Sequence, residues 1–294
     1  MSVPIATPVY SLAEGAWEGN VEDDEGVAWV VTAEEGWSSS APVRPRAEDR
    51  EASHGAWGGP GYYSARVITL TGTAVAPSRT AMLRAKDRIR FLTPDADPVV
   101  LRVDEAHMSR QAAVRLGADV KTTDRGAIGF DFSLTLLAVD PRRYGVVALS
   151  ATATLPTETA PGRTYPRLYP SGYGGATGGG AAVEVLNAGT FATGAVLRFY
   201  GPVNQPGVEE ETTGARLRYD VLLATDADML EVDLARRTAL LGGTASRRSR
   251  LLAGSAWFLL PPGPTRLRML GVRASSDAAD PDPRMDVEWR SAWN

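Results

Sequence analysis

Hydrophobic and polar residues alternate along most of this chain. The alternation is clearest at residues 226–260, where the apolar Leu230 and Val232 are interleaved with the charged Glu231 and Asp233. Successive side chains of a β-strand point to opposite faces of its sheet, so a period of two predicts a half-buried strand. Apolar residues return after a polar corner, which predicts an antiparallel meander for the whole stretch.

The same period predicts short strands in both halves of the chain. In the N-terminal half the predicted strands lie at residues 9–12, 27–32, 62–72, 99–105, 112–120 and 128–139, with a further candidate near Trp37. In the C-terminal half they lie at residues 183–186, 196–200, 217–222, 229–234, 238–241, 257–260, 266–270 and 285–289. Strands that recur about every ten residues are typical of a β-sandwich.

One segment, residues 78–92, has the helical period instead. Met82, Ala85 and Ile89 share one face at helical spacing, and Ser78 can cap the start. The opposite side carries Arg79, Lys86 and Arg90, which we expect to form a solvated or subunit-contacting face.

Changes in composition divide the chain into three parts. Residues 1–148 are expected to form a first domain of one sheet system and one helix. Residues 149–181 are rich in Ala, Thr and Pro and then in Gly, which predicts a linker followed by a Gly-rich loop at 172–180. Residues 182–294 are expected to form the β-sandwich. The predicted fold class is therefore mainly β.

A polar segment at residues 42–61 is long for a surface connection and holds several prolines and glycines. Loops longer than about 12 to 15 residues without structure of their own are usually functional or disordered. The segment carries Arg44, Arg46, Arg50 and His54. We expect these four residues to contact a neighbouring subunit or another protein.

Charge and composition exclude several classes of function. The 294 residues carry a net charge of −4, so no summed positive field attracts nucleic acid, although a local basic patch is compatible with it. There is no cysteine, which excludes disulfides and thiolate metal sites. No basic leader with an apolar core begins the chain and no apolar run approaches the ~20 residues of a membrane span, so we expect a soluble protein made without a signal peptide.

Candidate catalytic and metal-binding residues are few. Only His54 and His107 are present, far apart in sequence, so a histidine metal site or a catalytic triad is not expected, and no cofactor motif occurs. The acidic residues 22–25 lack the spacing of a calcium loop and are interpreted as a solvated turn. Glu231 and Asp233 share a strand face, as a glycoside hydrolase would need, but outward acids on strands are ordinary.

The tryptophans leave two interpretations open. Trp257 lies in a predicted strand and is expected to pack in the core. Trp293, the second-to-last residue of the sequence, could instead stack against a sugar ring. A carbohydrate-binding module that contacts a host surface is therefore an alternative function, and a cell-wall hydrolase that uses Glu231 is a third.

A series of short motifs, in a fixed order, resembles the distal tail proteins of long non-contractile phage tails, often described as minor tail proteins in phages of high-GC hosts. In the C-terminal half the motifs are GRTYPR at 162–167, NAGT at 187–190, GPV at 201–203, LEVD at 230–233 and WFLLPPG at 257–263. In the N-terminal half they are HG at 54–55, RVITLTG at 66–72 and DPR at 140–142. Only two of the 31 basic residues are lysines, which agrees with a GC-rich source.

The resemblance implies a two-domain structural virion protein without catalysis. Its N-terminal domain would be a tail-tube-like β-sandwich or barrel with one helix, and its C-terminal domain a galectin-like sandwich. Six copies would form a ring at the distal end of the tail, after assembly in the host cytoplasm. The implied partners are the tail tube protein, the tape-measure protein and downstream tail-tip or tail-fibre proteins. DNA would only pass through the central channel, and no membrane is involved.

Overall fold

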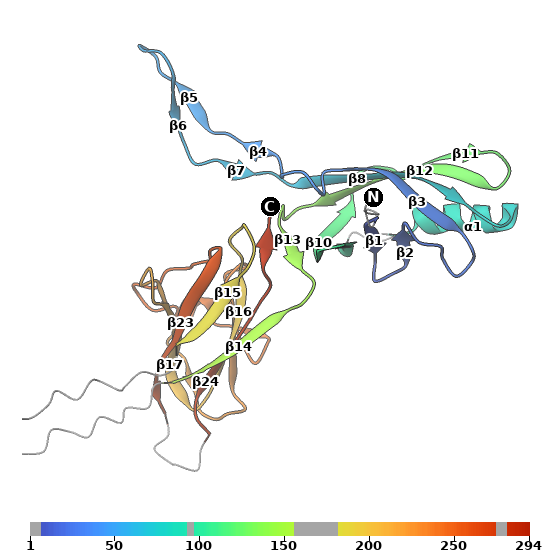
Figure 1. Cartoon of the computed structure of the whole chain (residues 1–294). Helices are drawn as coiled ribbons and strands as arrows, with labels where there is room; N and C mark the ends of the chain where they lie inside the picture. Colours follow the sequence, from blue (N-terminus) through green and yellow to red (C-terminus); the bar gives the residue numbers. More distant parts are fainter. Residues whose placement is uncertain (1–6, 93–96, 156–181, 275–280) are drawn as a thin grey trace, which may run out of the picture. The chain divides into compact units, whose positions relative to one another are not determined.

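The structure is a computed structural model that describes residues 7–92, 97–155, 182–274 and 281–294 (Figure 1). The chain divides into two compact units. Unit 1 comprises residues 1–146 together with Trp293 and Asn294, and unit 2 comprises residues 147–292. Strands dominate both units, so the predicted mainly β fold is confirmed.

Unit 1 is built on an antiparallel sheet with the strand order β2-β1-β9-β10-β12-β8-β3, to which β11 adds beside β12 and β13 beside β10. Its elements are β1 (Val9–Leu12), β2 (Trp17–Gly19), β3 (Ala28–Glu35), β8 (Arg66–Val75), α1 (Arg79–Arg90), β9 (Val99–Glu105), β10 (Met108–Leu116), β11 (Lys121–Arg125), β12 (Gly129–Ala138) and β13 (Arg143–Gly145). Strand β10 pairs with β9 over seven residue pairs but with β12 over only two. The sheet therefore has two halves, and both halves contribute to one core.

Aromatic rings occupy the centre of this core. Trp17 and Trp29 meet edge to face with their ring centroids 5.9 Å apart, and both rings contact Phe132 in the same way. Phe130 packs edge to face against Trp29 at 5.7 Å. Each such pair contributes about 0.5–1.5 kcal/mol beyond the burial of its area. These contacts tie β2, β3 and β12 together.

Helix α1 confirms the predicted helix. The hydroxyl oxygen of Ser78 accepts a hydrogen bond from the Ala81 N–H at 3.2 Å and so satisfies one donor of the first turn. Met82, Ala85 and Ile89 are buried in the unit 1 core, as their spacing predicts.

The basic face of α1 is solvated in part, as expected: Arg79 and Arg90 are exposed. Lys86 is buried, because strand β11, which the alternation does not predict, lies against it. Lys86 pairs with Asp124 of β11, and Arg79 approaches the same carboxylate at 3.3 Å. Arg90 donates a hydrogen bond to the Thr122 hydroxyl at 2.9 Å. Burial, with the nearby arginines, lowers the pKa of Lys86. These side chains hold β11 to the helix.

Unit 2 is a sandwich of two antiparallel sheets. One sheet has the order β14-β24-β16-β20-β21-β22, and the other has the order β15-β23-β17-β18 with β19 beside β17. The elements are β14 (Leu149–Thr154), β15 (Val183–Asn187), β16 (Ala195–Tyr200), β17 (Val203–Glu210), β18 (Arg216–Arg218), β19 (Leu222–Leu223), β20 (Met229–Asp233), β21 (Thr238–Leu241), β22 (Ala245–Ser246), the 3₁₀ turn η1 (Arg248–Arg250), β23 (Gly263–Arg273) and β24 (Arg284–Trp289). The last strand, β25 (Ala292–Trp293), belongs to neither of these sheets and pairs with β13. The predicted sandwich is confirmed.

The predicted meander is also found. Strands β20 and β21 pair antiparallel, and Leu230 and Val232 are fully buried between the sheets. Glu231 lies on the outer face and accepts a hydrogen bond from Arg198 at 2.9 Å. The same arginine binds Glu288 at 2.7 Å. The carboxylates of this face therefore tie neighbouring strands together.

Two sequence predictions are corrected in unit 2. Residues 149–154, expected to begin a linker, form β14, which pairs with β24 along its whole length and buries Ala153. Its side chains are too small to give a hydrophobic signal. Residues 257–260 were expected to form a strand but make only one bridge, between Leu260 and Thr193. Pro261 and Pro262 follow and have no N–H to continue a ladder.

The remainder of the expected linker, residues 156–181, lies outside the described residues. The Gly-rich loop at 172–180 and the motif at 162–167 belong to this part.

Candidate interaction surface

A hairpin formed by residues 43–63, here named the arm, replaces the loop that the sequence predicts. Strand β4 (Val43–Arg44) pairs with β7 (Tyr62–Tyr63), and farther out β5 (Ala47–Asp49) pairs with β6 (Ala56–Gly58). Pro45 lies between the two ladders and interrupts the pairing because it has no N–H. Figure 1 shows the arm leaving the end of β8 and extending away from the sheet of unit 1.

The arm has no core of its own. Every residue from 42 to 62 is solvent-exposed, and the rings of Trp57 and Tyr62 leave 66% and 60% of their residue surface uncovered. The Arg50 guanidinium lies 4.5 Å from the centre of the Trp57 ring, a stacking that contributes about 0.5–1 kcal/mol at exposed sites. An isolated two-stranded hairpin is marginally stable in water, so this surface favours a partner that covers it.

The base of the arm is held by a buried arginine. Arg66 is 1% exposed, and its Nη1 donates hydrogen bonds to the carbonyl oxygens of Gly36 and Ser39 at 2.5 Å. Its Nη2 donates to Oδ1 of Asn294 at 3.3 Å, and the Ala41 N–H donates to the same oxygen at 3.1 Å. Burial lowers the pKa of Arg66. Arg66, which follows the arm, is therefore tied to residues 36–41, which precede it.

The four predicted contact residues are spread along the arm. Arg44 lies in the inner ladder, Arg46 between the ladders, Arg50 at the end of the outer ladder and His54 in the terminal turn. They do not form one cluster. Trp57 is not among the four predicted residues, although it has the largest exposed ring of the arm. The sequence signal that could have identified it is an aromatic residue within an otherwise polar segment.

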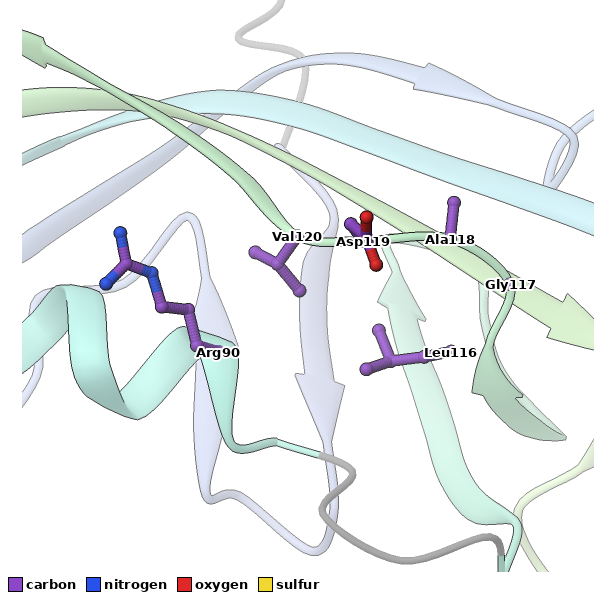
Figure 2. A pocket seen from close by; sticks show the side chains of 6 residues that line it. All are labelled: Arg90, Leu116, Gly117, Ala118, Asp119 and Val120. Atoms are coloured by element: carbon purple, nitrogen blue, oxygen red, sulfur yellow. The ribbon is translucent and has the colours of Figure 1, made fainter.

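Unit 1 has two hollows large enough to admit a small molecule. The first, of about 390 Å³, lies between the end of α1 and the segment after β10. Figure 2 shows Arg90 on the helix and Leu116, Asp119 and Val120 on the segment that faces it. Its lining holds one cation, Arg90, and one carboxylate, Asp119.

The second hollow, of about 300 Å³, is lined by the acidic residues near the β2–β3 connection. Its central carboxylate, Asp23, accepts a hydrogen bond from Trp29 Nε1 at 2.8 Å and pairs with Arg88. Burial acts to raise the pKa of Asp23, but these hydrogen bonds and the arginine charge bring it below its usual value. The Asp23 carboxylate therefore has a structural role: it connects the turn before β3 to Trp29 and to Arg88 of α1.

The side chains that could ligate a metal do not cluster among the residues that the structure describes. His54 lies in the turn of the arm and His107 in the turn between β9 and β10, so the two histidines belong to different elements. Within the described ranges, no group of three or more His, Asp or Glu side chains is placed to hold a metal ion. The described helix is too short and too polar to cross a membrane.

The tryptophans occupy different environments. Trp289 is buried in unit 2, and its Nε1 donates to the Leu186 carbonyl at 2.9 Å. Trp257 is partly exposed and packs against the unit 2 core from outside. Trp293, the candidate sugar-stacking residue, is partly buried and belongs to unit 1.

Comparison with known proteins supports the resemblance drawn from the motifs. Residues 188–293 match the family model described as the siphovirus-type tail component, C-terminal domain. A search of curated protein sequences found no match. The family match confirms, over this part of the chain, the predicted similarity to phage distal tail proteins.

Solved structures extend the likeness to the fold of nearly the whole chain. The Dit protein of phage SPP1, described as a paradigm of the hub adsorption apparatus in phages that infect Gram-positive bacteria, matches with a TM-score of 0.65 and 14% identity, over 96% of this chain and 98% of that one. A chain of the phage p2 baseplate in its activated conformation with Sr matches with a TM-score of 0.49 and 10% identity, over 96% and 98% of the two chains. The Dit match confirms the fold.

Proposed function

We propose that this chain, which carries the C-terminal domain of the siphovirus-type tail components, is a structural virion protein at the distal end of a long non-contractile phage tail. Six copies of unit 1 form a ring that continues the tail tube. Unit 2 is a galectin-like sandwich carried by that ring. The homo-hexamer connects the tube and the tape-measure protein to the tail-tip or tail-fibre proteins, and DNA passes through its channel.

The observation that carries this proposal is the uncovered arm on a unit with the fold of the SPP1 Dit protein. Exposed aromatic residues next to arginines are typical anchors of protein interfaces. Trp57 and Arg50 form such a pair on the arm, and Val43 and Tyr62 add further exposed apolar surface near its base. A neighbouring copy or the adjacent tube ring would bury this surface, with Arg44, Arg46 and His54 as additional contacts.

The distribution of charge is compatible with passage of DNA. The sequence of unit 1 contains 20 acidic and 16 basic residues, which equals the net charge of −4 of the whole chain, while unit 2 contains 15 of each. A ring built from an acidic unit repels phosphate groups on average. The summed electrostatic field of such a ring therefore does not hold the DNA duplex in the channel.

The test is the assembly state of the full chain and its position in the virion. Light scattering after size exclusion is expected to give a mass near six times 31.3 kDa at high protein concentration, and negative-stain images are expected to contain rings. Labelled antibodies should bind at the tail tip of intact particles. A chain that stays monomeric and is absent from the tip would contradict the proposal.

The carbohydrate-binding alternative requires an exposed aromatic ring on the sandwich. Trp293 belongs to unit 1 and Trp257 packs against the unit 2 core, so neither residue gives that alternative specific support.

A further inference from the structure

Charge is strongly segregated along the sequence of unit 2. Residues 234–276 contain eight arginines and no acidic residue. Because unit 2 has equal numbers of acidic and basic residues, its mean field is close to zero, and only the local arrangement of these arginines can attract an anion.

Five of the eight arginines lie within 4 Å of a carboxylate, and three of these five lie on β23. Arg268 binds Glu209 and lies 3.9 Å from Glu211, and Arg266 lies 3.6 Å from Glu211. Arg273 pairs with Asp282. These three residues belong to β23, on the other sheet of the sandwich.

The five arginines outside β23 flank the open end of the β21–β22 hairpin, two just before β21 and three just after β22, and we name them the basic corner: Arg236, Arg237, Arg247, Arg248 and Arg250. Arg236 and Arg237 form the turn that leads into β21. The Arg247 N–H donates to the carbonyl oxygen of Ala239 at 2.7 Å, which places residue 247 beside β21, and η1 follows directly.

Nearby carboxylates neutralise the positive charge of the basic corner only weakly. Arg236 lies 3.7 Å from Asp233 and Arg250 lies 3.9 Å from Asp220, and the two arginine side chains are 83% and 62% exposed. Pairs of this kind contribute little and leave the arginine available to a ligand.

The remaining members have no ion pair within the described part of the chain. The side chain of Arg247 is partly buried and donates to the adjacent Ser246 carbonyl at 3.2 Å, and Arg237 and Arg248 are exposed. The basic corner therefore carries five positive charges against two carboxylates on its rim.

The backbone conformation of Arg237 allows charge and stability to be changed in opposite directions. Its φ of 56° lies in the left-handed region, where glycine is favoured and another L-residue costs roughly 1–2 kcal/mol. Replacement of Arg237 by glycine should therefore relax the turn while it removes one charge. The variant should therefore be at least as stable as the parent chain but should bind an anion more weakly.

We infer that the basic corner binds a phosphodiester polymer. Guanidinium groups form paired hydrogen bonds with phosphate, and several arginines along one edge suit an anion whose charges repeat. No large hydrophobic residue is exposed between residues 234 and 256, all of which the structure describes, so the corner lacks the apolar anchors of a protein interface. It also lacks aromatic residues on which unpaired bases would stack.

Fluorescence anisotropy of the full chain tests this inference with three labelled probes: a 20-bp DNA duplex, poly(glycerol phosphate) and polyglutamate of similar length. At least one phosphate polymer is expected to bind at low salt, with an affinity that falls as salt rises because each neutralised phosphate releases counterions. Which of the two binds more tightly identifies the source of the phosphates.

The variants locate the site. Arg247→Gln with Arg248→Gln should weaken phosphate-polymer binding at least tenfold, and Arg237→Gly should weaken it while the melting temperature stays equal or rises. Arg84→Gln, which removes an exposed arginine of α1, is the matched control and should change binding less than twofold.

Three results would overturn the inference: no binding of either phosphate polymer at about 50 mM salt, unchanged binding in the double variant, or equally tight binding of polyglutamate. The inference is independent of ring formation, because the light-scattering mass of each variant is measured separately.

Discussion

The Nη2 atom of Arg66 donates a hydrogen bond to Oδ1 of Asn294 at 3.3 Å, so a residue after unit 2 in the sequence completes the anchor of the arm in unit 1. Arg143 donates to the main-chain carbonyl oxygen of the same residue, and burial lowers the pKa of Arg143 to about 10. Unit 1 is therefore assembled from two segments of the sequence that flank unit 2.

Asn294→Ala should destabilise unit 1. The substitution leaves the Ala41 N–H and one N–H of Arg66 without their acceptor, which costs about 1–3 kcal/mol for buried donors. Urea unfolding followed by tryptophan fluorescence measures the change in free energy of unfolding. Asn294→Asp keeps the acceptor beside two arginines and should retain the stability. An unchanged urea midpoint in Asn294→Ala would show that the anchor does not depend on this side chain.

Trp57→Ala should weaken self-association without destabilising the monomer. The ring is largely exposed in the single chain, but interface anchors of this type contribute about 2 kcal/mol or more, equal to roughly 30-fold in affinity. Sedimentation at several concentrations measures association, and thermal melting measures stability. Leu83→Ala, an exposed apolar residue on α1, is the control. Equal association of the two variants would exclude the arm as the contact.

Glu209→Gln should remove part of the acid sensitivity of unit 2. Hydrogen bonds from Arg268 and then Arg216 lower the pKa of Glu209 below its usual value, although burial opposes them. A carboxyl group whose pKa is lower in the folded state stabilises above its unfolded pKa of about 4.3, and this contribution is lost as pH falls through the folded pKa.

Urea unfolding at pH 7 and pH 3 measures this effect. At pH 7 the variant should lose on the order of 1–3 kcal/mol, and its stability should then change less between the two pH values than that of the parent chain. Glu184→Gln, an exposed carboxylate on β15, serves as the control. Identical pH profiles of parent and Glu209→Gln would count against the role of this carboxylate.

Trp289→Ala should cost more stability than Trp257→Ala. The buried ring of Trp289 fills the unit 2 core and its Nε1 is bonded, so its loss should cost about 3–5 kcal/mol through transfer and cavity terms. Trp257 covers the core only from one side, and its loss should cost less. Thermal and urea unfolding of both variants give the order, and the reverse order would place Trp257 in the core.

Gly72→Ala should destabilise unit 1 although it adds only one methyl group. A Cβ at this position would lie 2.2 Å from the Val30 carbonyl oxygen and 2.6 Å from a ring carbon of Phe132, so β3 and the ring must move. Overpacking of this kind costs about 1–3 kcal/mol. Gly126→Ala, at an open turn, meets no atom within 4 Å and should show only the cost of its positive φ. Equal melting temperatures of Gly72→Ala and the parent chain would contradict the close packing.

Elements with a strong local pattern could be predicted, and elements without one could not. Strand β12 alternates over ten residues and α1 buries one face at helical spacing, so both are visible in the sequence. Strand β17 contains Pro206 and Gly207 and a break in register, which hide its period. Strand β14 is made of small residues, and β11 is mostly exposed.

The arm illustrates what sequence spacing left open. Its length and its arginines indicated a contact surface, but its prolines and glycines predicted a loop. Pairing between β5 and β6, and the exposed ring of Trp57 above Arg50, depend on two segments that meet only in the folded chain.

By itself, the sequence determined the β-rich class, the helix at residues 78–92, the C-terminal sandwich and the resemblance to phage distal tail proteins, because periodicity and motif order are local properties of the chain. Only the tertiary structure decided that Asn294 belongs to unit 1, that β14 closes the sandwich, and that five arginines flank the open end of the β21–β22 hairpin. These relationships join residues that are distant in sequence or lie in different elements, and they arise from strand pairing and burial that no local pattern records.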